Sequence, residues 1–325
     1  MTDSYGRNID YLRVSLTDRC DLRCTYCMPK CGVDNIPHKE ILTLEETARI
    51  VRIMAGLGVK KLRITGGEPL IRRNVTGFVE LVSDITGIGE TCMTTNGTRL
   101  AEYASQLKAA GLHRINISLD TTHRDVFRKI TGTDMLEKVL EGIDAAYDAG
   151  FPIKINCVPM KGVNDKGLDS VALLAKERPI DVRFIELMPI GCGKEHAGIR
   201  SDTVLHQLEE HFGKAEPYER TDISSPAEYY RFSGFCGNIG FISPMSHKFC
   251  RYCDRARLTS NGFLKLCLQY PYGADLKTPL RNGCSDDELS EMILAAVRKK
   301  PLQHSFSDTD MTDDRKMVQI GGEYG

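Results

Sequence analysis

The stretch Ser15-Leu-Thr-Asp-Arg-Cys-Asp-Leu-Arg-Cys-Thr-Tyr-Cys-Met-Pro29 places Cys20, Cys24 and Cys27 at C-x3-C-x2-C spacing. An alternating apolar run from Tyr11 to Leu16 precedes it and predicts a strand, so the cysteines are expected in the loop after that strand. Three neighbouring thiolates can hold one 4Fe–4S cluster, which has four irons and would leave one iron without a protein ligand. An open iron is where a small molecule can coordinate, and this separates a catalytic cluster from one that only passes electrons.

Two other ligand sets stay open for this loop. A zinc ion would need a fourth ligand, which Cys31 could supply. Cys31 could also close the cluster, as in ferredoxins with the spacing C-x2-C-x2-C-x3-C, although Gly32 stands where those sequences have a proline.

The size and composition of the chain limit its class. Its 325 residues suffice for one large α/β barrel, or for a barrel with a small appendage. A net charge of −1 argues against a general nucleic-acid or anionic-membrane surface, because neither sign dominates. No apolar run approaches the ~20 residues of a membrane span, and Met1 to Asp10 is too polar for a signal peptide. We therefore expect a cytoplasmic protein.

The 12 cysteines are too few for a disulfide scaffold in a chain of this length. Cys20, Cys24 and Cys27 form one group, and Cys250, Cys253 and Cys267 form a second, so metal or cluster ligation is expected. Three others lie in or beside strand-like runs and are interpreted as core residues: Cys92, Cys157 and Cys192. Cys236 and Cys284 have no assigned role.

Strand-like and helix-like runs alternate through the first 200 residues. The strands are expected near residues 11–16, 61–65, 91–95, 114–119, 153–158 and 181–186, and the helices near 44–56, 74–85, 100–110, 135–149 and 167–176. Thr43-Leu-Glu-Glu46 reads as the capping box of the first helix. Six β/α units predict a parallel sheet with right-handed crossovers. Periodicity alone leaves a partial barrel and a doubly wound sheet both open.

The pattern changes after about Ser201. A helix is expected over 202–212, followed by a Pro-, Gly- and aromatic-rich region with the second cysteine group. We expect residues 1–225 to form the barrel and 226–325 a C-terminal extension that does not fold alone. Residues 303–316 are polar and predict a mobile or surface-draped strap.

Several polar or glycine-rich motifs follow predicted strands, where a parallel barrel keeps its site. Thr65-Gly-Gly-Glu-Pro69 is either a plain tight turn or a place where a ligand approaches the backbone closely. Thr94-Thr-Asn-Gly97 and Ser118-Leu-Asp120 follow the next strands, yet such residues are also common in loops and caps.

The second cysteine group has no obvious fourth ligand. His247 or Cys284 would complete a structural zinc site, and otherwise a second cluster with an open iron is expected. Arg255-Ala-Arg257 lies within this group and offers two forked cations suited to phosphate. The alternative is a solvated pair whose side chains point apart.

The first cysteine loop, with Tyr26 between its last two cysteines, resembles the radical S-adenosylmethionine superfamily. That resemblance implies a six-stranded partial (β/α)6 TIM-type barrel. It also implies that S-adenosylmethionine binds the open iron and is reductively cleaved to a 5′-deoxyadenosyl radical. Four residues are implied as contacts of this cofactor: Tyr26, Gly67, Ser118 and Met188.

A wider set of motifs resembles the GTP 3′,8-cyclase family of molybdenum cofactor biosynthesis. The set comprises 13–20, the cluster loop, 63–69, 94–97, 154–156, 183–186, 249–257 and Ile320-Gly-Gly322. The resemblance implies two 4Fe–4S clusters held by the two cysteine groups, and GTP contacts at Arg13, Arg63, Thr94, Lys154, Arg255 and Arg257. It implies catalytic roles for Cys20, Cys24, Cys27, Arg255, Arg257, Gly321 and Gly322. In the family the chain normally ends at the Gly-Gly, whereas here Glu323-Tyr-Gly325 follows.

The implied reaction is abstraction of the ribose C3′ hydrogen of GTP by the 5′-deoxyadenosyl radical, followed by attack of the carbon radical on guanine C8. The implied partners are a reductant such as flavodoxin or ferredoxin and the downstream cyclic pyranopterin monophosphate synthase, and a homodimer is compatible with the family.

Two alternative functions are a radical enzyme that modifies a peptide and a non-enzymatic zinc or iron–sulfur regulator. Triphosphate-binding arginines disfavour the first, and the lack of a helix-turn-helix signal disfavours the second.

Overall fold

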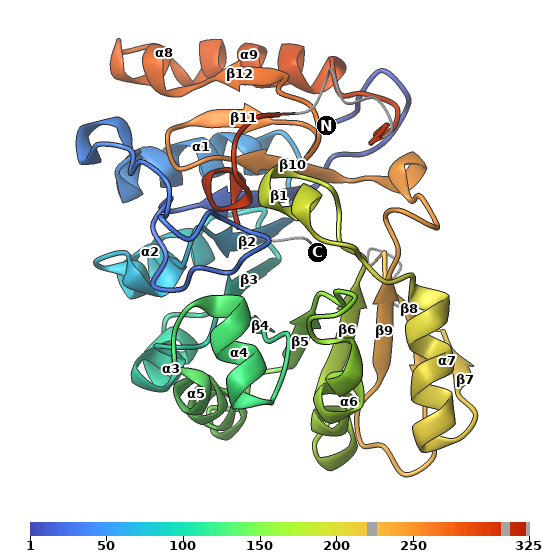
Figure 1. Cartoon of the computed structure of the whole chain (residues 1–325). Helices are drawn as coiled ribbons and strands as arrows, with labels where there is room; N and C mark the ends of the chain where they lie inside the picture. The colour runs from blue at the N-terminus through green and yellow to red at the C-terminus, as the bar shows by residue number, and fades with distance from the viewer. Residues whose placement is uncertain (220–225, 307–312, 323–325) are drawn as a thin grey trace.

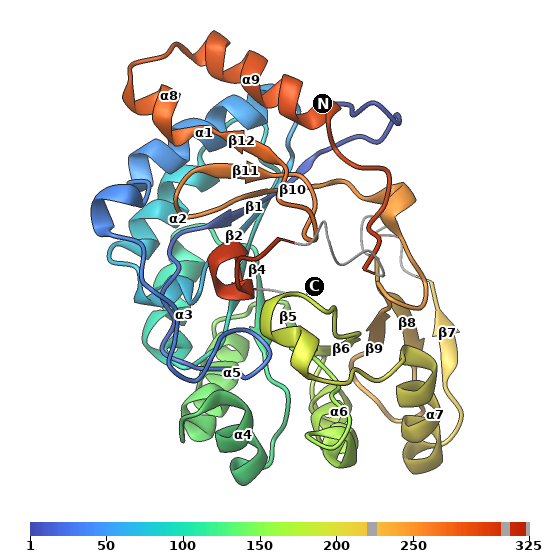
Figure 2. The same ribbon diagram turned by 45° about the horizontal axis from the view of Figure 1, so that its top comes forward.

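A computed structural model describes residues 1–219, 226–306 and 313–322, and its centre is a parallel sheet. Six strands run in sequence order and adjacent strands pair in parallel: β1 (Tyr11–Ser15), β2 (Lys61–Thr65), β3 (Glu90–Thr95), β4 (Arg114–Ser118), β5 (Ile153–Cys157) and β6 (Asp181–Ile185). Each lies where the sequence predicts it. The partial (β/α)6 barrel is therefore confirmed, and Figure 2 shows the strands as an open arc.

The C-terminal region adds one parallel strand to each edge of these six. β10 (Arg255–Leu258) pairs with β1, and β9 (Ile239–Ile242) pairs with β6. Antiparallel strands continue the sheet outward on both sides: β11 (Phe263–Lys265) and β12 (Gly273–Asp275) beyond β10, and β8 (Glu228–Arg231) and β7 (Glu216–Tyr218) beyond β9. The extension is thus built into the barrel's own sheet. The expectation that it does not fold alone stays a prediction. The expected boundary at 225/226 adjoins residues 220–225, which lie outside the described part of the chain.

The α-helices lie on the outer side of the arc (Figure 1). They are α1 (Leu44–Gly56), α2 (Val75–Ser83), α3 (Leu100–Ala109), α4 (Arg124–Thr131), α5 (Leu136–Asp148), α6 (Leu168–Glu177), α7 (Ser201–Phe212), α8 (Lys277–Arg281) and α9 (Asp286–Arg298). The predicted capping box of α1 is present, since Thr43 Oγ1 accepts from Glu46 N–H at 3.1 Å and Glu46 Oε2 accepts from Thr43 N–H at 2.8 Å. None of the described helices is long and apolar enough to cross a membrane.

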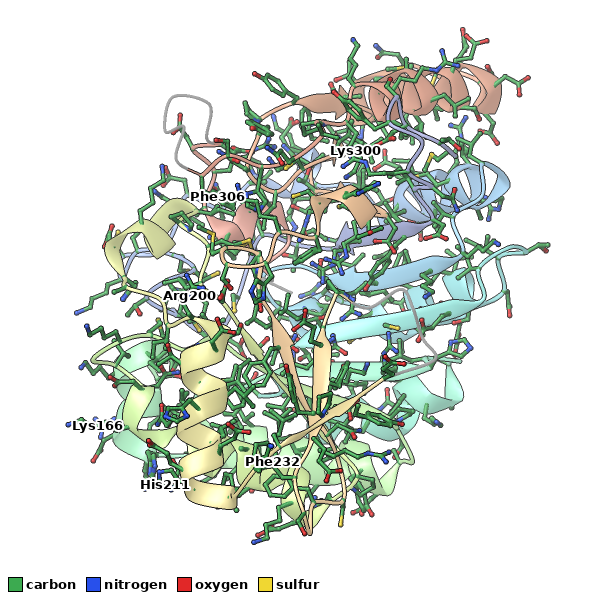
Figure 3. All side chains as sticks on the ribbon, turned by 90° about the vertical axis from the view of Figure 1, so that its right-hand side faces the viewer. Lys166, Arg200, His211, Phe232, Lys300 and Phe306 are labelled. Atoms are coloured by element: carbon green, nitrogen blue, oxygen red, sulfur yellow. The ribbon has the colours of Figure 1, made fainter. Side chains whose placement is uncertain are left out.

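Short 3-10 helices mark several loops: η1 (His38–Glu40), η2 (Pro69–Ile71), η3 (Asp165–Gly167), η4 (Gly191–Glu195), η5 (Cys250–Tyr252) and η7 (Met317–Ile320). Lys300 and Phe306 lie at the end of the molecule that carries α9, while Lys166, His211 and Phe232 lie at the opposite end (Figure 3). Leu12, Ile64 and Met93 belong to the large apolar core, which also takes in the buried faces of the helices. Because side chains alternate along a strand, Arg13 and Arg63 lie on the opposite face of the sheet from this core, which is the inner face of the barrel.

Candidate active site

The three-cysteine loop leaves the end of β1 and is held by contacts with the next two strands. Cys20 Sγ accepts hydrogen bonds from Leu22 N–H at 3.4 Å and from Asn96 Nδ2 at 3.7 Å. Asn96 follows β3 and also donates to Asp21 Oδ1 at 2.7 Å. Thr98 Oγ1 donates to the other carboxylate oxygen of Asp21 at 2.6 Å, so the loop is tied to the motif after β3.

The sulfurs of this loop interact with one another. Burial raises the pKa of Cys20 to about 12, with the Glu68 charge adding to the rise. Burial also raises the pKa of Cys24 and of Cys27, and both shifts include repulsion from other cysteines of the loop. Iron coordination would remove these protons and neutralise the thiolates. Across the described residues, no group of three or more His, Cys, Asp or Glu side chains is arranged to hold a metal ion. The choice between a cluster and zinc at Cys20, Cys24 and Cys27 therefore rests on their spacing and on the family.

Gly66 and Gly67 pack against the backbone of residues 17–19, at the start of the cysteine loop. Gly67 N–H donates to Thr17 O at 2.7 Å, and a Cβ added at Gly67 would lie 2.1 Å from Arg19 O. Glycine is therefore required there by close backbone approach. The close approach is made by the chain's own backbone at Asp18 and Arg19, so the implied cofactor contact at Gly67 stays a prediction.

Glu68 is a fully buried carboxylate that joins the ends of β2 and β3. It accepts from Leu70 N–H at 2.9 Å, Thr95 Oγ1 at 2.7 Å and Asn96 N–H at 2.7 Å. Burial raises the pKa of Glu68 to about 7, while these three hydrogen bonds oppose the rise. The residue positions Asn96, which in turn contacts Cys20.

The other implied cofactor residues lie around the same loop. Tyr26 is buried, and its hydroxyl donates to Asp120 Oδ2 at 2.7 Å. Ser118 is the last residue of β4 and lies in register with Asn156 of β5. Met188 is buried in a small apolar group that includes Tyr26 and Ile320. The predicted positions therefore surround one region, at the C-terminal ends of the strands.

Buried cations form a row across the inner face of the barrel. Arg13 lies in register with Arg63 on one side and with Arg257 on the other. By register through β3 and β4, Lys154 of β5 and Arg183 of β6 lie on the same face of the sheet as Arg63. All five are at most 8% exposed. Such a concentration of buried positive charge suits a ligand with several negative charges.

Polar neighbours hold these cations in place. Arg63 donates to Thr94 Oγ1 at 3.1 Å and to the hydroxyl of Tyr11. Lys154 Nζ lies 3.3 Å from the Tyr229 hydroxyl and 3.9 Å from Asp181 Oδ2. Lys154 is therefore partly compensated by a carboxylate inside the barrel. Both residues still face the interior in which a substrate would bind.

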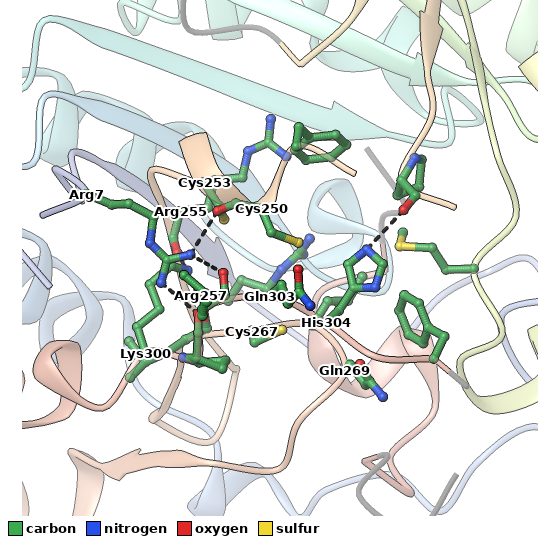
Figure 4. Close-up of a pocket in the computed structure, with 18 residues that line it drawn as sticks. Arg7, Cys250, Cys253, Arg255, Arg257, Cys267, Gln269, Lys300, Gln303 and His304 are labelled. Carbon is green, nitrogen blue, oxygen red and sulfur yellow. Dashed lines mark hydrogen bonds between the residues drawn. The ribbon is translucent and has the colours of Figure 1, made fainter. Parts of the chain in front are cut away.

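The second cysteine group lines a cavity at the β10 end of the arc. Cys250, Cys253 and Cys267 surround it together with Arg255 and Arg257 (Figure 4). The side chains proposed as fourth zinc ligands, His247 and Cys284, do not line this cavity, although the structure describes both. Cys284 packs instead against the main apolar core. Three cysteines line this cavity, and a second cluster held by them stays a prediction.

Basic residues compensate the thiols of this group. Burial would raise the pKa of Cys253, but the charges of Lys300 and Arg255 bring it below its usual range. Lys300 Nζ donates to Arg255 O at 2.8 Å, and Arg7 donates to Cys250 O at 2.8 Å. The environment of Cys253 thus favours the thiolate that iron needs.

Arg255 and Arg257 were expected, under the solvated alternative, to point apart. That expectation was wrong, because both lie in β10, and residues two apart in a strand share one face. Tyr11 and Arg13, their partners in β1, are likewise two residues apart. Both arginines line the cavity. Arg255 stacks its guanidinium over the rings of Tyr11 and Phe249, at 5.8 and 5.5 Å from the centroids.

The C-terminal tail enters the site from the concave side of the arc (Figure 2). A Cβ at Gly322 would lie 2.3 Å from Gly66 O, and one at Gly321 would lie 3.2 Å from Thr65 Oγ1 and 3.9 Å from Arg257 Nη1. Gly321 and Gly322 have φ values of +107° and +60°, which favour glycine. The extension Glu323-Tyr-Gly325 lies outside the described residues.

The described ends of the predicted strap are anchored, while residues 307–312 lie outside the described part of the chain. His304 and Asp313, on either side of that segment, are buried. The side-chain amide of Gln269 accepts from Ser305 N–H at 2.7 Å and donates to Ser305 O at 2.6 Å. The backbone carbonyl of Gln269 accepts from Asp313 N–H at 2.7 Å.

Some residues of this site were not predicted from the sequence. Five were not singled out at all: Tyr229, Gln269, His304 and the anchor residues Lys265 and Asp313. Glu68, Asn96 and Arg183 lie in motifs that the sequence analysis quoted, but no role was given to them there. The alternation of polar and apolar residues in β6 could have indicated Arg183, because this arginine stands between the buried apolar Val182 and Phe184. The others meet the site through contacts between segments far apart in the chain, which periodicity does not report.

Comparison with known proteins agrees with this geometry. The family model of the Radical SAM superfamily matches residues 14–175, and that of Molybdenum Cofactor Synthesis C matches residues 180–306. A barrel of this kind with a three-cysteine loop after β1 defines a radical S-adenosylmethionine enzyme.

The chain is 48% identical over 326 residues to the GTP 3′,8-cyclase of Desulforamulus reducens, and the alignment covers 99% of this chain and 100% of that protein. It is 46% identical to the GTP 3′,8-cyclase of Peptoclostridium acidaminophilum, over 99% and 98% of the two chains. The chain belongs to the GTP 3′,8-cyclase family.

Similar solved structures support the fold alone. Streptococcus suis SuiB bound to S-adenosylmethionine has a TM-score of 0.62 and 15% identity, covering 90% of this chain and 68% of that one. SuiB bound to precursor peptide SuiA gives a TM-score of 0.61 at the same identity. At 15% identity the peptide of SuiB says nothing about this chain's substrate, and the full-length relatives disfavour the peptide-modifying alternative.

Proposed function

We propose that the chain cyclises GTP to (8S)-3′,8-cyclo-7,8-dihydroguanosine 5′-triphosphate, the first step of molybdenum cofactor biosynthesis. The observation that carries this proposal is the row of buried cations, Arg257, Arg13 and Arg63 with Lys154, between the two cysteine groups. The negative charges of a triphosphate need compensation by buried cations, whereas a peptide substrate would not need it. Membership of the GTP 3′,8-cyclase family supports the same substrate.

The chain's own residues bind and orient the reactants. The cations bind the triphosphate, and Thr94, held by Arg63, lies where it can add a neutral hydrogen bond. Cys20, Cys24 and Cys27 would hold the first cluster, with Tyr26, Gly67, Ser118 and Met188 around S-adenosylmethionine. When bound and reduced, that cluster and cofactor supply the 5′-deoxyadenosyl radical that takes the ribose C3′ hydrogen. The close-packed tail and loops exclude water from the reacting centre.

The second cluster is part of the proposal. Cys250, Cys253 and Cys267 would hold it, with the guanine base at its open iron, as the resemblance implies. Residues 226–325 then form a functional region that carries this cluster and the Gly-Gly tail, although their strands complete the barrel's sheet. Gly321 and Gly322 would act beside Thr65 and Arg257, their neighbours in the structure.

The proposal extends to the chain's surroundings. A flavodoxin- or ferredoxin-type protein would reduce the first cluster, and cyclic pyranopterin monophosphate synthase would consume the product. We place the enzyme in the cytoplasm, where free thiols persist. A homodimer remains compatible with this scheme.

Anaerobic reconstitution of the full chain tests this function. About eight irons per chain are expected from two 4Fe–4S clusters. S-adenosylmethionine cleavage should depend on GTP and yield the cyclic nucleotide. Cys27→Ala should abolish cleavage, whereas Cys267→Ala should spare cleavage more than product. About four irons with stoichiometric zinc would overturn the second cluster, and cleavage without any nucleotide product would overturn the function.

A further inference from the structure

Lys300 brings a buried positive charge to the cavity of the second cysteine group. It stands just after α9, is 3% exposed, and lines this cavity together with Cys250, Cys253 and Cys267 (Figure 4). Burying an ammonium group is costly unless a negative charge compensates it, because the group gives up its hydration. The partners of Lys300 therefore indicate what kind of group the cavity holds.

The described partners of Lys300 are two backbone oxygens on the segments that carry the cysteines. Its Nζ donates to Arg255 O at 2.8 Å and to Leu266 O at 2.5 Å. Arg255 follows Cys253 by two residues, and Leu266 directly precedes Cys267. One ammonium group thus joins the two segments and stays close to both of their thiols.

Within the part of the chain that the structure describes, no carboxylate lies in ion-pair range of Lys300. Two neighbouring cations of the cavity differ in this respect, since Arg7 pairs with Asp3 at 2.6 Å and Arg255 lies 3.6 Å from Asp254. Carbonyl oxygens orient an ammonium group but leave its net charge in place. The second cysteine group can supply the missing negative charge, because its thiols must be deprotonated to hold iron.

We propose that the Lys300 ammonium is the counter-charge of the iron–sulfur group held by the second cysteine group, and that it makes this iron–sulfur group easier to reduce. The inference rests on the second cluster of the proposed function and adds a residue that acts on its charge. Reduction by one electron adds one negative charge to the cavity. A fixed positive charge stabilises the reduced form more than the oxidised form, and this effect is strong where water is excluded.

Substitutions at Lys300 separate its charge from its role in fastening the two segments. Lys300→Arg keeps the charge and the donors, Lys300→Gln keeps a donor without the charge, and Lys300→Met removes both. Lys299→Gln is the matched control, because Lys299 is the neighbouring lysine and is exposed. All are made in the full chain carrying Cys20→Ala, Cys24→Ala and Cys27→Ala, so that any cluster signal comes from the second cysteine group.

The measurements are the iron content and the midpoint potential, the latter from an anaerobic dithionite titration followed by electron paramagnetic resonance. The parent, Lys300→Arg and Lys299→Gln are expected to hold about four irons and to share one potential. In both neutral Lys300 variants, the ratio of reduced to oxidised cluster at a fixed potential should fall roughly ten-fold. That fall corresponds to a midpoint about 59 mV more negative for a one-electron couple.

If one neutral variant loses its iron, the other carries the measurement. Loss of iron from both, with Lys300→Arg intact, would support the counter-charge. Loss from Lys300→Arg as well would overturn it, because Lys300 would then only fasten the segments. An unchanged potential in an iron-loaded neutral variant would also overturn it and leave the second cluster standing. Absence of iron from the parent itself would overturn the second cluster together with this inference, whereas GTP-dependent cofactor cleavage by wild type tests the function separately.

Discussion

Glu68 shows how one buried side chain organises the site. Its carboxylate ties the loop after β2 to the loop after β3, and through Asn96 it reaches Cys20. The carboxylate has no cation among the contacts described for it, and burial raises its pKa to about 7. This arrangement makes the stability of the protein depend on pH.

The sign of that dependence follows from proton binding. Between about 4.5, the ordinary pKa of a glutamate, and 7, the folded protein keeps the Glu68 proton that the unfolded chain releases. This residue's contribution to stability is therefore full below pH 4.5, falls as pH rises, and is lost above pH 7. Its total change is on the order of 3 kcal/mol. Glu68→Gln should remove it, so urea unfolding free energies of wild type and variant should converge or cross between pH 4.5 and 7. Parallel curves would show that Glu68 ionises in the folded protein as it does in water.

Arg255 and Arg257 allow a direct test of triphosphate recognition. A hydrogen bond to a charged group is worth about 1.5–3 kcal/mol, so each Arg→Ala change should weaken GTP binding roughly ten- to hundred-fold. Cluster content should barely change. Arg251→Ala is the matched control, because Arg251 lies in the same segment but is exposed. If all three variants bind GTP like the parent in equilibrium titrations, the pair does not hold the nucleotide.

At the scale of elements, the six parallel strands and most helices between them were predictable, and the short C-terminal strands were not. All six strands β1–β6 and the helices α1, α2, α3, α5, α6 and α7 lie within a few residues of their predictions. Each has a long periodic run or a clear cap. By contrast α4, α8 and α9 were not predicted, although Ser285 and Glu288 form a capping box for α9. The short strands β9 and β10 become strands because β6 and β1 offer them edges, which is a tertiary cause that no local pattern reports.

The tail is fastened to β11 by a buried ion pair. Lys265 is fully buried, and its ammonium contacts Asp313 and donates to Tyr270 O at 2.5 Å. Asp313 also pairs with Arg315 at 2.8 Å. This anchor lies just before the segment that carries Gly321 and Gly322 into the site. We therefore expect it to set the position of the tail.

Lys265→Met should release the tail without disturbing the clusters. Removing one partner of a buried pair costs about 3–5 kcal/mol, because the other charge stays buried. Hydrogen exchange at residues 313–322 should rise and product formation should fall, while iron content stays unchanged. Lys277→Met is the control, since Lys277 pairs with the half-exposed Glu40 away from the tail. Equal exchange at the tail in both variants would contradict an anchoring role.

At the scale of the whole molecule, the barrel and the C-terminal region meet around one interior. Met188 lines the cavity of Cys250 and also packs with Tyr26 of the first cysteine loop, so it lies between the two groups. The sequence could indicate both cysteine groups, because their spacing is local. The sequence could not indicate that β10 brings Arg257 beside Arg13. The register between strands so far apart in the chain depends on how the whole sheet packs.

The Gly-Gly tail completes this interior, which leads to a prediction about its length. Met317, Val318 and Ile320 are buried, and Gly322 N–H donates to Met317 O at 2.8 Å, so the tail is packed up to its second glycine. Gly322→Ala would push a Cβ toward Gly66 O and strain a left-handed backbone.

Deletion of residues 321–325 should therefore abolish the cyclic nucleotide while S-adenosylmethionine still binds. Truncation after Gly322 should preserve or raise product formation, because it keeps every described contact of the tail. Gly322→Ala in that shorter chain should behave like the deletion. The measurement is product formation and cofactor binding by the reconstituted proteins, compared at equal iron content. Full activity after loss of both glycines would mean that the tail fills space beside Thr65 and Arg257 without contributing to the reaction.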